Sequence, residues 1–283
     1  MMRPIKLFTD STSDLPEETV KQHGIAIIPL YVNFGTQSYK DNVDIKPAEL
    51  FRKVEETGKL PMTSAPTTPD FVDGFKKYID QGMDILHISI SSKISASYQN
   101  ACTAAEQFPE GRVRAIDSLN LSSGIGFSVM NAVDCIEKGM SLDETYEAVQ
   151  SAVPKVRSKF LVDTVEYLHK GGRCSGLQML LSSLLEIHPI LAVDAGSIRV
   201  AAKVRGNRQT ALHKLYKEEL ENIDRVGTNR LIITNCECAE DVLPIKARFA
   251  ELNAIQEILL ANASCVIASH CGPRTAGFFY QEN

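Results

Sequence analysis

Short apolar runs that alternate with helical patterns are the feature that most constrains how this chain can fold. The run at residues 5–9 stops at a polar loop, and a helical pattern continues from there to residue 23. The runs at 84–91 and 113–117 are also followed by helical patterns. Strands that alternate with helices are typical of βαβ units in a parallel sheet. We therefore predict an α/β protein with a parallel sheet in its N-terminal half.

The segments between these units are less regular. Residues 25–34 are rich in β-formers but contain Pro29, which favours an edge or irregular strand. Residues 60–68 are rich in Pro, Thr and Ser and are predicted to be a loop, with Thr68 as the N-cap of the next helix.

The pattern changes near Pro154, and 283 residues suit two domains. We predict domains at 1–157 and 158–283. In the second domain we expect strands at 160–168, 231–235 and 266–269, helices at 177–187, 207–221 and 239–252, and a hairpin of 189–193 with 198–204.

Composition excludes several function classes. Hydrophobic residues make up 44% of the chain, and the net charge is −5 with no Trp, so the basic, aromatic surface of a general nucleic-acid binder is missing. No signal peptide or transmembrane segment is recognisable, and seven cysteines lack the spacing of a disulfide framework or a zinc site. We expect a cytoplasmic protein with buried free thiols and no metal.

Motifs for catalysis are missing as well. The sequence holds no P-loop, no complete dinucleotide-binding glycine pattern, no nucleophile elbow and no zinc-protease motif. We therefore expect no catalytic residues and no cofactor.

Small hydroxyl residues gather where several predicted strands end, at 10–13, 63–64, 91–97 and 118–123. In an open α/β sheet, ligands bind beyond the carboxyl ends of the strands. Hydroxyl and backbone amide donors suit a carboxylate or a phosphate, and Ser95 lies near a helix N-terminus that favours an anion. The alternative, which the residues leave open, is that these side chains only cap helices.

Five motifs occur in order along the whole chain: D-S-T-S-D-L-P at 10–16, M-T-S-A-P at 62–66, I-S-S-K-I-S-A-S-Y-Q-N-A at 90–101, G-G-R at 171–173 and H-x-G-P at 270–273. Together they resemble the DegV family of bacterial fatty-acid-binding proteins. The resemblance implies the EDD fold: a Rossmann-like N-terminal domain, a C-terminal α/β domain and a long-chain, palmitate-like fatty acid between them. It also implies a non-catalytic subunit that presents the acid to a separate fatty acid kinase for phosphorylation to an acyl phosphate.

The matching motifs imply that Thr63 and Ser95 hydrogen-bond the carboxylate of the fatty acid. Further candidates for head-group contacts are Ser64, Ser92, Arg173 and His270. For Arg173, a structural salt bridge is the alternative. His270 is expected just after the last strand. The sequence departs from the family pattern at Ala96 and Arg274, where a glycine is common.

For the tail, the apolar segment at 177–187 is either a channel lining or an ordinary core helix. Its candidate lining residues are Leu177, Met179, Leu180, Leu181, Leu184, Leu185 and Ile187.

Two other functions stay open. One is an acyl hydrolase or phosphotransferase with Ser95 or Ser92 as nucleophile and His270 as base. The other is a lipid-responsive regulator.

Overall fold

The computed structural model describes residues 3–174, 187–221, 223 and 226–283. The elements of the N-terminal half are β1 (Ile5–Asp10), α1 (Glu17–Gln22), β2 (Ala26–Ile28), β3 (Tyr31–Phe34), β4 (Gln37–Lys40), α2 (Pro47–Thr57), β5 (Met62–Ser64), α3 (Thr68–Ile79), β6 (Asp84–Ser89), α4 (Ser97–Ala105), β7 (Val113–Asp117), α5 (Ser123–Glu137) and α6 (Leu142–Ala152). Those of the C-terminal half are β8 (Val156–Leu161), α7 (Glu166–Gly171), β9 (Ile187–Asp194), β10 (Ser197–Arg205), α9 (Arg208–Glu221), β11 (Val226–Cys236), α10 (Ala239–Glu251), β12 (Glu257–Asn262), α11 (Cys265–Cys271) and β13 (Thr275–Glu282).

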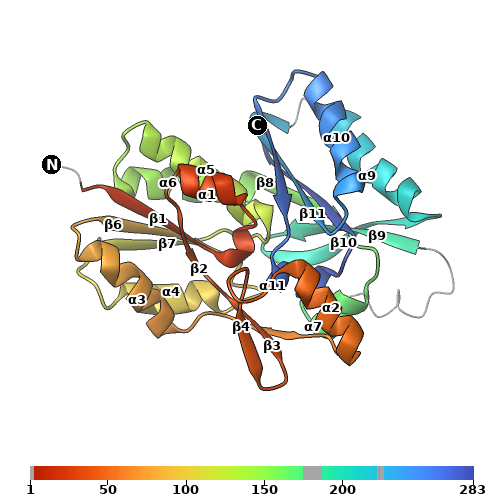
Figure 1. Cartoon of the computed structure of the whole chain (residues 1–283). Helices are drawn as coiled ribbons and strands as arrows, with labels where there is room; N and C mark the ends of the chain where they lie inside the picture. Colours follow the sequence, from red (N-terminus) through yellow and green to blue (C-terminus); the bar gives the residue numbers. More distant parts are fainter. Residues whose placement is uncertain (1–2, 175–186, 222, 224–225) are drawn as a thin grey trace.

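The N-terminal sheet has the strand order β2-β1-β6-β7, and all its pairs are parallel. Helices α3 and α4 pack on one face and α5 and α6 on the other (Figure 1). The predicted parallel sheet is confirmed. Pro29 separates β2, which is an edge strand, from β3, which belongs to another sheet.

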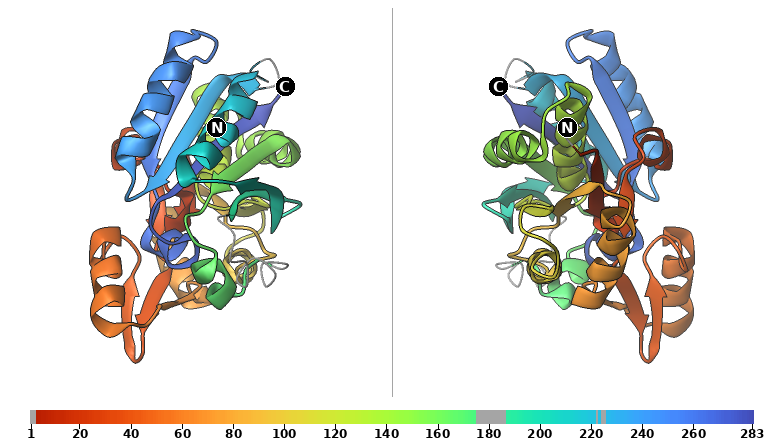
Figure 2. Two further views of the ribbon diagram at one scale, coloured as in Figure 1. Left: turned by 90° about the vertical axis from the view of Figure 1, so that its right-hand side faces the viewer. Right: turned by 90° about the vertical axis from the view of Figure 1, so that its left-hand side faces the viewer.

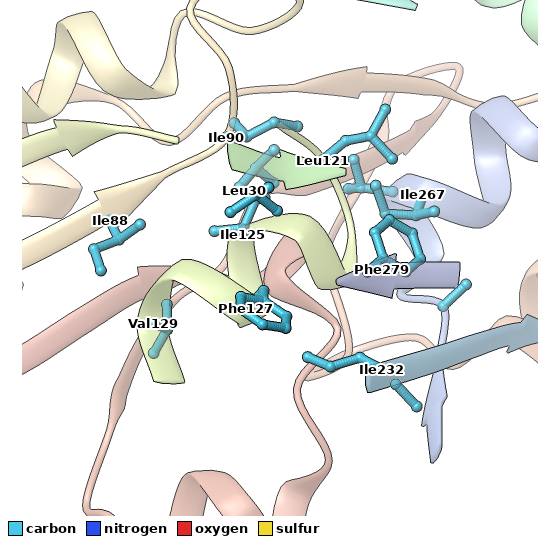
Figure 3. Close-up of a cluster of buried hydrophobic side chains, with 14 of the residues drawn as sticks. Leu30, Ile88, Ile90, Leu121, Ile125, Phe127, Val129, Ile232, Ile267 and Phe279 are labelled. Atoms are coloured by element: carbon cyan, nitrogen blue, oxygen red, sulfur yellow. The ribbon is translucent and has the colours of Figure 1, made fainter. Parts of the chain in front are cut away.

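The C-terminal sheet has the order β10-β9-β8-β13-β11-β12 and is mixed, because only β11 and β12 are parallel. The predicted α/β class holds for this half too, and the β9–β10 hairpin is confirmed. Helices α9 and α10 cover the outer face of the sheet (Figure 2), whereas the buried, mostly apolar α5 contacts strands of both large sheets. A continuous apolar core thus runs from one sheet to the other through α5 (Figure 3).

A third, small sheet (β4-β3-β5) lies below the two large ones in Figure 1. Its strand β5 corrects the prediction of a loop over 60–68. Val32 of β3 pairs with Thr63. The three residues of β5 have no strong strand character, and they are extended because β3 supplies their backbone partners. The next helix also begins one residue earlier than expected, with Thr67 as its N-cap.

Two further predictions in the C-terminal half are wrong. The strand expected over 160–168 ends at Leu161, and α7 follows it, closed by Gly172 in a left-handed conformation. The strand expected over 266–269 lies inside helix α11, which Ser264 caps. The β-branched residues of α11 are buried, and this tertiary packing outweighs their weak helix propensity.

The apolar helix expected over 177–187 lies outside the described residues, except for Ile187, which begins β9. No helix within the described ranges is long and apolar enough to cross a lipid bilayer.

Candidate functional site

A cavity of about 180 Å³ lies where the three sheets meet, and residues from both halves of the chain line it. Its wall includes polar side chains: Thr63 and Ser64 of β5, Ser95 before α4, Arg173 after α7 and His270 of α11. The rest of the wall is mostly apolar and is formed by Leu30, Ala65, Ile90, Ile94, Ala96, Leu121, Ile198, Val266, Ile267 and Cys271. An apolar space with a few convergent polar groups is typical of a small-molecule site.

Thr63 and His270 contact each other in this wall. Thr63 Oγ1 lies 2.8 Å from His270 Nε2, across 207 positions of sequence. Burial, and then the positive charge of Arg173, lower the pKa of His270 to about 4, so the ring is neutral near pH 7. In the tautomer protonated at Nε2, the ring donates to Thr63 and leaves the threonine hydroxyl hydrogen available for a ligand.

Ser95 has a similar arrangement. Its Oγ accepts a hydrogen bond from the Ser97 backbone N–H at 3.2 Å, at the start of α4. Within the described ranges, its hydroxyl hydrogen has no recorded acceptor. With His270 in this tautomer, Thr63 and Ser95 each have a hydroxyl hydrogen available to a ligand in the same cavity.

Arg173 brings the only cationic side chain among the described lining residues. Its Nη1 donates to the Gly171 carbonyl at 2.6 Å, and no carboxylate within the described ranges forms a salt bridge with it. A head-group contact and a structural salt bridge both stay predictions for Arg173. An anion in the cavity would have a guanidinium nearby.

Two glycines of the G-G-R motif shape this part of the wall. A Cβ on Gly171 would lie 2.2 Å from His270 Nδ1, so only a glycine lets the imidazole pack against this backbone. Gly172 closes α7 with φ +67°, which turns the chain toward Arg173. The motif thus positions both His270 and Arg173.

We predict that Gly171→Ala lowers affinity for a cavity ligand about tenfold, because the added methyl group displaces His270 from Thr63. Gly172→Ala is the matched control. It carries the same added methyl group in open space and costs about 1 kcal/mol of backbone strain, but leaves His270 in place. Calorimetric titration of both variants, with melting curves, makes the comparison, and equal affinities would contradict the prediction.

The other predicted candidates differ in their surroundings. Ser64 also lines the cavity, and its Oγ accepts from Asn33 Nδ2 at 3.2 Å, much as Ser95 Oγ accepts from Ser97. Ser92 is not among the lining residues; its backbone N–H donates to the Asp117 carboxylate. Ser92 therefore lies outside the wall of this cavity.

The hydroxyl residues at 10–13 and 118–123 mostly serve as internal cross-links. Asp10 accepts hydrogen bonds from Ser89 and Ser97, which ties the end of β1 to β6 and α4. The Ser122 hydroxyl donates to Oδ2 of the Asp14 carboxyl group. These two groups therefore cross-link distant segments, and neither η1 (Ser11–Ser13) nor α5 has the side-chain N-cap that the alternative expected.

Two buried carboxyl groups hold the start of α11 in place. Asp14 Oδ1 accepts the Ser264 backbone N–H at 2.9 Å, and Asp41 Oδ1 accepts that of Cys265 at 2.8 Å. Burial, together with the neighbouring Asp41 charge, raises the pKa of Asp14 to about 8, although the Ser122 and Ser264 hydrogen bonds oppose the shift. Burial also raises the pKa of Asp41. Sequence analysis missed this supporting role, because nothing in the motif at 10–16 marks a carboxyl group as buried.

His270 itself is placed by α11 rather than by a loop after the last strand, as was expected, and β13 follows it. Its Nδ1 is buried without a partner in the described structure, and its Nε2 contacts Thr63 rather than Ser95 or Ser92. No serine–base pair therefore forms at this site in the described residues. Across the same residues, no group of His, Cys, Asp or Glu side chains is placed to hold a metal ion.

The whole chain matches known proteins closely. A model of a family described as uncharacterised protein, DegV family, matches residues 4–283. A DegV domain-containing protein of Clostridium acetobutylicum is 36% identical over 99% of both chains, and one of Caldanaerobacter subterraneus is 31% identical over 99% of this chain and 100% of its own.

Solved structures agree with these relatives. A DegV family protein of Thermus thermophilus, described as binding fatty acid, is 32% identical with a TM-score of 0.89, and each chain covers 100% of the other. A Thermotoga maritima protein with a described fatty acid binding function is 26% identical with a TM-score of 0.84, again over 100% of both chains. The five motifs, the two large sheets and these matches over nearly the full length lead to one conclusion: the chain belongs to the DegV family.

Proposed function

We propose that this chain binds a long-chain, palmitate-like fatty acid, with its carboxylate on Thr63 and Ser95 and its tail among the apolar residues of the cavity. The observation that carries the proposal is the pair of hydroxyls, Thr63 and Ser95, in the wall of an otherwise mostly apolar cavity. The fatty acid binding described for the Thermus thermophilus protein supports it. The acid lies between the proposed domains, 1–157 and 158–283.

The tail supplies most of the affinity. Burying about a dozen methylenes at about 0.8 kcal/mol each yields roughly 10 kcal/mol of transfer free energy, before the cost of immobilisation. The carboxylate must be hydrogen-bonded, since an unpaired buried charge would offset that gain. Thr63 and Ser95 supply donors, and Arg173 on the same wall adds a positive charge.

The chain acts as a non-catalytic subunit that presents the carboxylate to a separate fatty acid kinase. One feature supports this role: His270 contacts Thr63, and the described head-group side chains include no serine–base pair. The transfer would then depend on a phosphoryl donor held by the partner enzyme.

Denaturing mass spectrometry of the purified full chain tests binding, and we expect about one fatty acid per chain. Absence of lipid, together with failure to take up added palmitate, would overturn the proposal. A second assay mixes the loaded chain with a bacterial fatty acid kinase and ATP and follows acyl phosphate by hydroxamate formation. Product only when both proteins are present supports presentation. Ester hydrolysis by the chain alone, lost in Ser95→Ala, would favour an enzyme instead.

A further inference from the structure

A second, smaller void lies next to the cavity, on the side of the C-terminal sheet. Its volume is about 20 Å³, and it shares Leu121, Ile267 and Cys271 with the wall of the cavity. Figure 3 shows Leu121, Ile267 and Phe279 converging between α5 and the C-terminal sheet. Its remaining lining residues are Ser122, Phe160, Thr234, Asn235, Ala263, Thr275, Gly277 and Phe279.

The polar side chains around this void are engaged elsewhere. Ser122 donates to Asp14, Thr234 pairs with the Ser123 hydroxyl, and Thr275 donates to the Cys271 carbonyl at 2.9 Å. Asn235 donates to the Ala261 carbonyl at 3.1 Å. A void of this size can hold one water, but a buried water needs two to four polar partners. The void therefore suits a methyl group better than a water molecule.

Gly277 keeps this space open. It lies in the middle of β13, paired with Phe160 of β8 and Thr234 of β11. A Cβ there would lie 2.9 Å from Cε2 of Phe279 and 3.2 Å from Cβ of Phe160, so the Phe279 ring would have to shift. Glycine weakens a strand interior, and its presence often marks a close approach by a ligand or another backbone.

We propose that the terminal methyl of the fatty acid enters this void, and that Gly277 and Phe279 set the longest chain that the protein accepts. The inference rests on the proposed function, because it extends the same cavity. Helix α11 links the two regions: Ile267 and Cys271, one turn apart, border both spaces, while His270 reaches the head-group end. The tail then runs past Ile267 and Cys271, and the C-terminal sheet forms the far wall of the void.

The test measures the affinity of the full chain for laurate, myristate, palmitate, stearate and arachidate. In the unmodified protein, affinity should rise about fourfold per added methylene until the tail fills the void, and then stop rising. We call the chain length at which affinity stops rising the break. Gly277→Ala fills the void and should move this break to chains shorter by about two carbons. Phe279→Leu removes part of the end wall and should move it to chains longer by about two carbons.

Phe278→Leu is the matched control, because it makes the same change on the same strand but on the other face of the sheet, where Phe278 packs against Phe249. Its break should equal that of the unmodified protein. If Gly277→Ala does not fold, Ala263→Val adds methyl groups to the same void and replaces it. Folded variants with an unchanged break would overturn this inference alone, whereas an unmodified protein that binds none of the five acids would overturn the proposed function.

Discussion

A chain with Thr63→Ala and Ser95→Ala together should bind palmitate about 100-fold more weakly than the unmodified protein, or worse. Each variant removes a hydroxyl donor to a carboxylate, and hydrogen bonds to charged groups contribute about 1.5–3 kcal/mol each. Each single variant should therefore weaken binding by about tenfold or more. Calorimetric titration of delipidated protein measures the loss, and denaturing mass spectrometry measures the lipid that copurifies.

Controls separate this head-group effect from a general loss of structure. Thr63→Ser keeps a hydroxyl within reach of His270 and should retain most of the affinity. Ser92→Ala changes a side chain outside the cavity wall and should bind normally. If the double variant retained as much lipid as the unmodified protein, the assignment of the carboxylate to Thr63 and Ser95 would be wrong.

The sequence predicts the N-terminal sheet well, because β1, β6 and β7 are apolar runs that end in polar loops, and each is followed by a helix. It fails where pairing or burial decides the structure. Thr63 is extended only because β3 supplies its backbone partners. The segment at 265–271 has the composition of a strand but is a buried helix, and the signals that could have shown this were the cap Ser264 and Gly272 beyond its end.

Five of the six candidate residues, Thr63, Ser64, Ser95, Arg173 and His270, line one cavity, and their role in binding stays a prediction. Their contacts could not be predicted, because the close approach of Gly171 to His270 appears only in three dimensions. Hydroxyl residues that bind a ligand and hydroxyl residues that cross-link the core look alike in sequence. Likewise, the sequence alone does not distinguish the carboxyl groups of Asp14 and Asp41 from carboxyl groups that face a ligand. Only the structure shows that both side chains are buried.

Asp14 should make the protein less stable as the pH rises. Its pKa is about 8 in the folded chain against an ordinary value of 3.8, so between these values the folded state keeps a proton that the unfolded state has released. Stability from this group is fully present below pH 3.8 and is lost as the pH rises through 8. The loss amounts to about 6 kcal/mol over the whole window.

The comparison with Asp14→Asn isolates this contribution, because asparagine keeps the shape of the side chain and stays neutral at every pH. His270 has an opposite slope between about pH 4 and 6.5, since its pKa is lowered on folding, so the range from pH 6.5 to 8 is the clearest. Urea unfolding at four pH values should show a falling free energy of unfolding in the unmodified protein and a flatter profile in Asp14→Asn.

Glu144→Gln is the control. The Ser141 hydrogen bonds lower the pKa of Glu144, so this group titrates below the range and its variant should keep the slope of the unmodified protein. Equal slopes in the unmodified protein and Asp14→Asn would mean that Asp14 is already ionised where it holds the first turn of α11, and that Ser122 and Ser264 compensate its burial.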